Sequence, residues 1–136
     1  MNQPHNLVAL VTLLALVFYF WTALAVGGAR GRYKVEAPAM TGAPEFERAV
    51  RIQMNTLEGL ALFLPSLWLF ALYWNDRVAA AAGAVWILGR IIYAVGYSSA
   101  PRNRSAGFLI QMLASLFLLF GAIGGVVWAI VQIGAI

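Results

Sequence analysis

The stretch PEFERAVRIQMNTLEGLALFLP, residues 44–65, decides the fold of this chain. It opens with a proline followed by Glu45 and Glu47, and proline at the first position with acids in the first turn favours a helix start. From Leu57 onward its single charged residue is Glu58. The pattern predicts an apolar helix that enters a membrane, with ionisable groups in its N-terminal turns. Charge at that depth is costly, so it indicates a functional site.

The composition of the 136 residues indicates an integral membrane protein. Hydrophobic residues make up 62% and charged residues 10%, against roughly 45–50% and 25% in soluble domains. There is no cysteine and one histidine, so disulfides and thiolate sites are excluded and no metal is expected. The net charge is +4, but the basic residues flank apolar runs, as membrane topology signals do. No nucleic-acid partner is therefore expected.

Four apolar runs predict an all-α, four-helix membrane bundle that forms a single domain over residues 1–136. Each run holds at least the ~20 residues needed to cross ~30 Å of hydrocarbon at about 1.5 Å per residue. The segments between the runs are polar or contain proline and glycine, which interrupt helices. The expected spans are residues 7–27, 44–74, 77–97 and 105–136.

The loops give the expected orientation. Lysine and arginine gather between the first and second spans and between the third and fourth. The positive-inside rule places these two loops on the cytoplasmic face and both termini on the opposite face. Gly121 with Gly125, and Ala80 with Ala84, have the spacing of close helix contacts. Pro65 either bends the second helix or is simply tolerated there.

Polar side chains of several helices are expected to meet near one membrane face. On the second helix, Arg51, Asn55 and Glu58 share a face through their i, i+4, i+7 spacing. Gln53 points about 160° away from Asn55, at about 100° per residue. The expected patch also holds Arg90, Tyr93 and Tyr97 from the third helix, Arg104 from the start of the fourth and Arg30 from the end of the first.

The charge of this patch predicts an anionic ligand. Arginine guanidinium groups bind carboxylates through paired hydrogen bonds, and Glu58 would accept an ammonium group. A peptide-like molecule with two carboxylates and one amine fits that set. Structural alternatives stay open: Glu47 would pair with Arg51 along the helix, and Glu58 would pair with Arg51 or Arg90 to hold the bundle together.

The motif FER-x-x-R-x-Q-x-N-x-x-E, residues 46–58, resembles the signature of the membrane-associated proteins in eicosanoid and glutathione metabolism, the MAPEG family. That family includes microsomal glutathione transferases and leukotriene-forming glutathione conjugases. The resemblance is supported by Arg90-x-x-Tyr93-x-x-x-Tyr97, by Arg104 and by Arg30. The four-span layout also matches, so the resemblance covers nearly the whole chain.

The resemblance implies a homotrimer that binds glutathione, its co-substrate, between adjacent subunits without a metal. One subunit would supply Arg51, Asn55, Glu58, Arg90, Tyr93, Tyr97 and Arg104. The next subunit would supply Arg30 and Gln53. Arg104 would be the catalytic residue, because it would stabilise the glutathione thiolate for attack on a hydrophobic electrophile from the bilayer. The resemblance also implies a role in detoxification and a glutathione-dependent peroxidase activity.

Two residues depart from the leukotriene-forming members, and two other functions stay open. Gly59 stands where those members carry a glutathione-contacting tyrosine, and Gly31 separates Arg30 from Arg32, which leaves the role of Arg32 open.

One alternative function is that of a non-catalytic member that binds lipid and a partner. The other is a small four-helix transporter with Glu58 as the proton-coupled carboxylate. The surrounding arginines argue against that cation site, since like charges repel.

Overall fold

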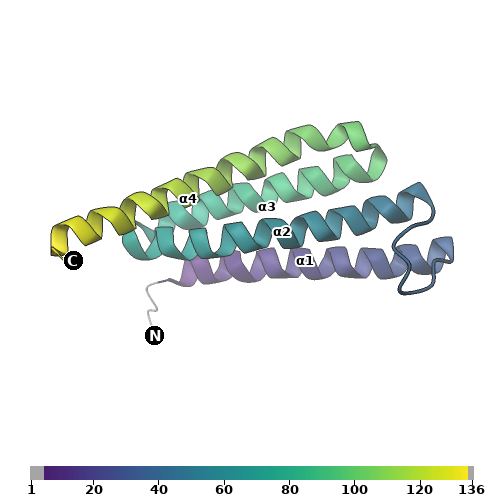
Figure 1. The fold of residues 1–136 in the computed structure, drawn as a ribbon, viewed down its shortest axis with the longest axis horizontal. Helices are drawn as coiled ribbons and strands as arrows, with labels where there is room; N and C mark the ends of the chain where they lie inside the picture. Colours follow the sequence, from purple (N-terminus) through teal and green to yellow (C-terminus); the bar gives the residue numbers. More distant parts are fainter. Residues whose placement is uncertain (1–4, 135–136) are drawn as a thin grey trace.

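Four long helices joined by short connections make up the protein, here a computed structural model that describes residues 5–134 (Figure 1). They are α1 (Asn6–Tyr33), α2 (Pro44–Tyr73), α3 (Asp76–Ser99) and α4 (Ser105–Ile133), with a short 3-10 helix, η1 (Pro101–Arg104), before α4. All four are long and apolar enough to cross a membrane. The predicted all-α, four-span bundle is confirmed, and the chain is an integral multi-pass membrane protein.

The first helix is longer than the expected span of residues 7–27. It continues to Tyr33, which places Arg30 and Arg32 in its last turn. Basic side chains stabilise the negative end of the helix dipole. Lys34 then adopts a left-handed conformation with φ of 54° and donates its backbone N–H to the Arg30 carbonyl. This local cap ends the helix after its apolar run has finished.

The other boundaries follow from caps and turns. The α3 helix begins at Asp76 because the Asn75 side chain caps it, accepting a hydrogen bond of 3.0 Å from the Val78 N–H. The polar residues Asn75 and Asp76, between the second and third apolar runs, thus form the start of this helix. Arg104 closes η1 and α4 begins at Ser105. The last residues of the expected span 105–136 lie outside the described region.

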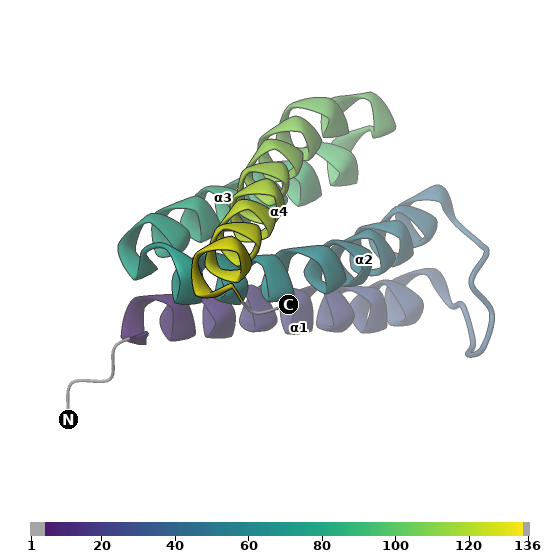
Figure 2. The same cartoon turned by 60° about the vertical axis from the view of Figure 1, so that its left-hand side comes forward.

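The helices are arranged as two pairs. The α1–α2 and α3–α4 connections lie at one end of the bundle and the α2–α3 turn at the other (Figure 1). The α3–α4 pair diverges from the α1–α2 pair toward the end that carries η1 (Figure 2). The polar residues of α2 and η1 therefore lie where the bundle opens. Which face is cytoplasmic stays a prediction.

Close packing at the opposite end uses the expected GxxxG pair. A methyl group on Gly121 would collide with the Phe70 ring, and one on Gly125 would lie 2.7 Å from Trp74 Nε1. Trp74 also donates a 2.6 Å hydrogen bond to the Gly121 carbonyl. The predicted close contact is confirmed. The pair in α3 is not, because Ala80 is buried but Ala84 is exposed.

A second close contact, between α3 and α4, gives a test of the packing. A side chain at Gly107 would collide with the Tyr93 backbone, including Cα at 2.6 Å, whereas Gly124 on the same helix has nothing within 4 Å. Alanine normally stabilises a helix over glycine by about 1 kcal/mol. We expect Gly107→Ala instead to lower the free energy of unfolding by about 2 kcal/mol, through overpacking. Gly124→Ala should be neutral or stabilising. Unfolding in detergent micelles measures both; equal stability would contradict the close contact.

Candidate active site between α2, α3 and α4

A cavity of about 560 Å³ opens between α2, α3 and α4, next to η1. Its lining residues are Arg51, Asn55, Tyr93, Arg104, Ser105, Phe108 and Leu109. Four of the residues expected from the sequence are thus brought together by three different elements. Two of them are arginines, and no carboxylate lines the cavity. Its electrostatic character is therefore cationic.

Arg90 lies behind this cavity. Its side chain is fully buried, and it donates hydrogen bonds of 2.7 Å to Asn55 Oδ1 and 2.6 Å to Thr56 Oγ1. Its guanidinium also lies 4.3 Å from the centre of the Tyr93 ring. Neutral oxygens and an aromatic face thus stabilise the buried charge. The geometry makes Arg90 a residue that positions Asn55 and Tyr93, rather than one that lines the cavity.

Thr56 is a site residue that the sequence reasoning missed. Its hydroxyl donates a 2.7 Å hydrogen bond to the Ile52 carbonyl and accepts one from Arg90. It is fully buried. Thr56 could have been predicted from its position directly after Asn55, on a helix that has to supply hydrogen-bond acceptors to a buried arginine.

Two stacked tyrosines connect α3 to η1. The rings of Tyr93 and Tyr97 lie 5.6 Å apart and are nearly parallel. The Arg104 guanidinium lies 5.7 Å from the centre of the Tyr97 ring. Cation–π contact of this kind orients an otherwise exposed arginine. Arg104 is thereby held among the residues that line the cavity, which also include Arg51.

Glu58 lines an adjacent hollow of about 300 Å³ that shares Asn55 and Phe108 with the cationic cavity. Within residues 5–134, Glu58 forms no ion pair with Arg51 or Arg90. The alternative in which Glu58 holds the bundle together is therefore wrong. The Glu47–Arg51 pair is not formed either, because Glu47 Oε1 accepts a 3.1 Å hydrogen bond from the Gly42 N–H. Both Glu58 and Arg51 remain available to a ligand.

Arg30 and Gln53 do not line the cavity, which corrects the single patch expected from the sequence. Arg30 donates a 2.7 Å hydrogen bond to the Ala39 carbonyl and lies over the Phe46 ring. Gln53 is half-buried on another face of α2, because it is two positions from Asn55. Arg32 lines a separate cavity of about 420 Å³. The chain thus forms the cavity without these three residues.

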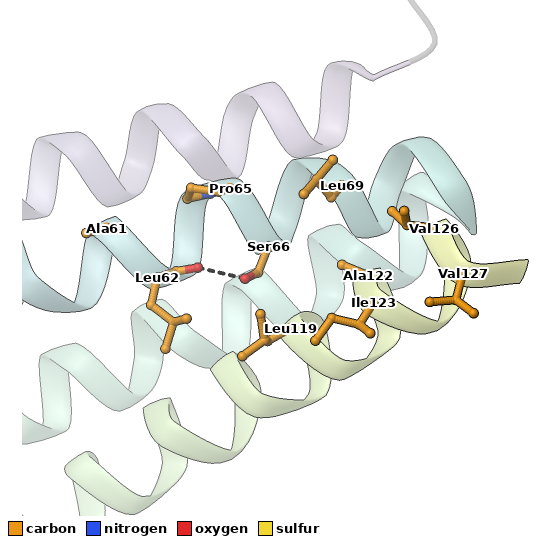
Figure 3. Close-up of a pocket in the computed structure, with 10 residues that line it drawn as sticks. All are labelled: Ala61, Leu62, Pro65, Ser66, Leu69, Leu119, Ala122, Ile123, Val126 and Val127. Atoms are coloured by element: carbon orange, nitrogen blue, oxygen red, sulfur yellow. Dashed lines mark hydrogen bonds between the residues drawn. The ribbon is translucent and has the colours of Figure 1, made fainter. Parts of the chain in front are cut away.

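An apolar groove continues from the hollow along α2 and α4. It measures about 360 Å³ and shares Leu62 with the hollow. Figure 3 shows side chains of both helices facing each other across it. Pro65 lacks the backbone N–H that would bond to the Ala61 carbonyl. The neighbouring Ser66 hydroxyl donates a 2.7 Å hydrogen bond to the Leu62 carbonyl. Cationic cavity, hollow and groove therefore follow one another along α2 and α4 with shared lining residues, and together they are called the channel below.

The model of the MAPEG family matches residues 8–124 of the chain. The chain belongs to the MAPEG family. Among its MAPEG relatives, microsomal glutathione S-transferase 2 of Homo sapiens is 42% identical over 87% of this chain and 81% of the relative. Leukotriene C4 synthase of Bos taurus is 35% identical over 88% of this chain and 85% of that protein.

A further MAPEG relative, an uncharacterized protein of Synechocystis, is 49% identical over 92% of this chain and 91% of its own. In each of these comparisons, the match covers at least 81% of both proteins. The resemblance seen in the motif of residues 46–58 is confirmed. In residues 5–134 of this MAPEG chain, no group of three metal-ligating side chains comes together.

Proposed function

We propose that the protein is a membrane glutathione transferase that activates the glutathione thiolate for attack on hydrophobic electrophiles from the bilayer. The observation that carries the proposal is the cavity in which Arg51 and Arg104 lie together without a carboxylate. The names of the two characterised relatives, a glutathione transferase and a leukotriene synthase, support it. The apolar groove beside the cavity supplies a route for the second substrate.

The spacing of the charges suits glutathione. Arg51 and Glu58 are seven positions apart on α2, which is about 10 Å at 1.5 Å per residue. An extended tripeptide is also about 10 Å long. The arginines would bind the glycine carboxylate and Glu58 the ammonium group at the other end of the molecule.

Electrostatics suffice for the chemical step. A thiol with a reference pKa of about 8.5 is mostly protonated at neutral pH. Lowering that pKa by two units requires about 2.7 kcal/mol of preferential stabilisation of the thiolate. The Arg104 guanidinium can supply this when the bound substrates exclude water from the cavity. The thiolate sulfur then bonds to the electrophilic carbon as the leaving group departs, or as an epoxide ring opens and takes up a proton.

Purified protein should produce an ultraviolet thiolate signal when glutathione is added near neutral pH. It should also conjugate a model aryl halide to glutathione, and a hydroperoxide in place of the halide reports the peroxidase reaction. A lipid- or partner-binding member would give neither thiolate nor product. Proton-coupled uptake in proteoliposomes without a thiolate signal would instead support a transporter.

We also propose that the enzyme is a homotrimer whose site is completed by Arg30 and Gln53 of the next subunit. Their separation from the cavity of their own subunit supports this. Arg30→Ala and Arg51→Ala subunits should each be inactive alone. When the two kinds of subunit assemble randomly into trimers, about one quarter of the sites should be active. These are the sites at which an intact Arg51 of one subunit meets an intact Arg30 of the next.

The matched control mixes Arg51→Ala with Asn55→Ala. Both residues belong to the same subunit's cavity, so no mixture restores a complete site. Absence of recovery in the Arg30–Arg51 mixture would contradict a shared site, whereas recovery in the control would contradict the division of residues between subunits.

A further inference from the structure

The hollow beside Gly59 contains two polar side chains that the proposed site has not used. Gln111 and Ser115 lie one turn apart on α4, are 4% and 2% exposed, and line the hollow together with Glu58. Within residues 5–134, neither the Gln111 amide nor the Ser115 hydroxyl has a hydrogen-bond partner in the protein, and neither side chain has a fully enclosed unpaired atom, so both are open to the hollow that they line. A polar group at membrane depth is stabilised when a ligand supplies the missing hydrogen bond.

Other buried hydroxyl groups of the bundle form hydrogen bonds within the protein. Thr22, Thr56 and Ser66 each donate to a carbonyl of their own helix, at 2.6 to 2.7 Å. That bond satisfies a hydroxyl without any ligand. Ser115 departs from this pattern, and so does its neighbour Gln111. Both are therefore available to a polar group that enters the hollow.

Gly59 keeps this pair accessible. A Cβ atom at position 59 would lie 3.9 Å from Gln111 Oε1 and 3.4 Å from Trp86 Cζ2. A large side chain there would extend into the hollow and separate Gln111 from Glu58. Because glycine has no side chain, nothing at position 59 stands between Gln111 and the hollow that Glu58 also lines.

The charge of the hollow indicates which group it takes. Glu58 is the one ionisable residue among those lining it, whereas the neighbouring cavity carries two arginines. The channel is therefore cationic at its mouth and anionic one step deeper. An ammonium group has three donors and no acceptor. A carboxylate, an amide carbonyl and a hydroxyl supply three acceptors.

We propose that Gln111 and Ser115 join Glu58 in a subsite for a primary ammonium group, which, given the proposed function, is that of glutathione. Asn55 closes the side of the subsite toward the cavity. In this chain Gln111 provides the polar contact at a place where position 59 provides none. Gln111 and Ser115 are thus ligand-binding residues of α4.

The test compares two ligands in matched variants. One is glutathione; the other is glutaryl-cysteinyl-glycine, the same molecule without its amino group. Thiolate absorbance gives the affinity of each for wild type, Gln111→Met and Ser115→Ala. Methionine keeps the length and unbranched shape of Gln111, which packs against Gly89. Thr22→Val is the control, since it removes a buried hydroxyl remote from the channel.

We expect wild type to prefer glutathione, and Gln111→Met to reduce that preference about tenfold and Ser115→Ala about threefold, within the range that single hydrogen bonds contribute. Affinity for the amine-free ligand should stay unchanged, as should both affinities in Thr22→Val. An unchanged preference, or equal loss for both ligands, overturns the subsite alone. Absence of a thiolate signal from wild type with either ligand overturns the proposed function and the subsite with it.

If Gln111→Met fails to fold, Gly59→Leu fills the hollow from the other side. The subsite requires that this variant also lose its preference for glutathione over the amine-free ligand. Gly59→Ala, whose added methyl group makes only ordinary contacts, should keep most of it. Equal preference in Gly59→Leu and wild type overturns the subsite.

Discussion

Arg104→Ala should lower turnover with a model aryl halide about 25-fold at neutral pH, with a smaller loss of glutathione affinity. Arg104 lines the cationic cavity and lies over the Tyr97 ring. If its guanidinium lowers the pKa of the bound thiol by two units from about 8.5, its removal costs about 2.7 kcal/mol of thiolate stabilisation. The thiolate population at pH 7 then falls roughly 25-fold, from about three quarters to about 3%.

The pH dependence separates this role from simple binding. Without Arg104, the pKa of the bound thiol should rise toward about 8.5. The variant should therefore recover activity as pH increases, while the wild-type rate is already level near neutral pH. Thiolate absorbance and turnover, both measured against pH, report the shift.

Arg102 provides the matched control. It lies two positions away in η1, is exposed, and does not line the cavity. Arg102→Ala should keep the wild-type pKa and rate while making the same change in net charge. An Arg104→Ala enzyme with an unchanged thiol pKa would remove Arg104 from the catalytic step.

The second large effect is expected at Arg90. Arg90→Met removes the donors to Asn55 Oδ1 and Thr56 Oγ1, which lie 2.7 and 2.6 Å from the guanidinium. A buried polar group left unpaired costs about 1–3 kcal/mol. With two such groups, the free energy of unfolding should fall by about 2–5 kcal/mol. Glutathione affinity should also fall, because Asn55 loses the bond that orients it.

Unfolding in detergent and thiolate titration measure the two effects. Arg77→Met is the control, because Arg77 is exposed in the first turn of α3 and lies at the other end of the bundle. It should change neither quantity appreciably. Wild-type stability in Arg90→Met would show that Asn55 and Thr56 do not depend on Arg90.

Several features of the site were predictable from the chain because they are local. The i, i+4, i+7 spacing placed Arg51, Asn55 and Glu58 on one face of α2, and all three line the channel. Helical periodicity is a property of the backbone, so it holds whatever the helix packs against. The same rule turned Gln53 away from Asn55. The glutathione-binding roles of these residues stay predictions.

The unpredicted features depend on how helices cross. Thr56 became important because the α2–α3 packing places it 2.6 Å from the Arg90 guanidinium. Gln111 and Ser115 are polar residues in an apolar span. The sequence shows that they are unusual there, but not which helix they face. Their meeting with Glu58 depends on the close approach of α4 to α2, for which no local pattern exists.

The sequence by itself determined the number of spans and most helix ends. Apolar length, the proline at the start of α2 and the asparagine cap of α3 act within one or two turns, so they need no partner helix. The tertiary structure decided which charges meet. It buried Arg90 behind Asn55, held Arg104 over Tyr97 and turned Arg30 toward its own loop. These outcomes depend on contacts between residues far apart in the chain, where the glycines of α3 and α4 set how closely helices approach.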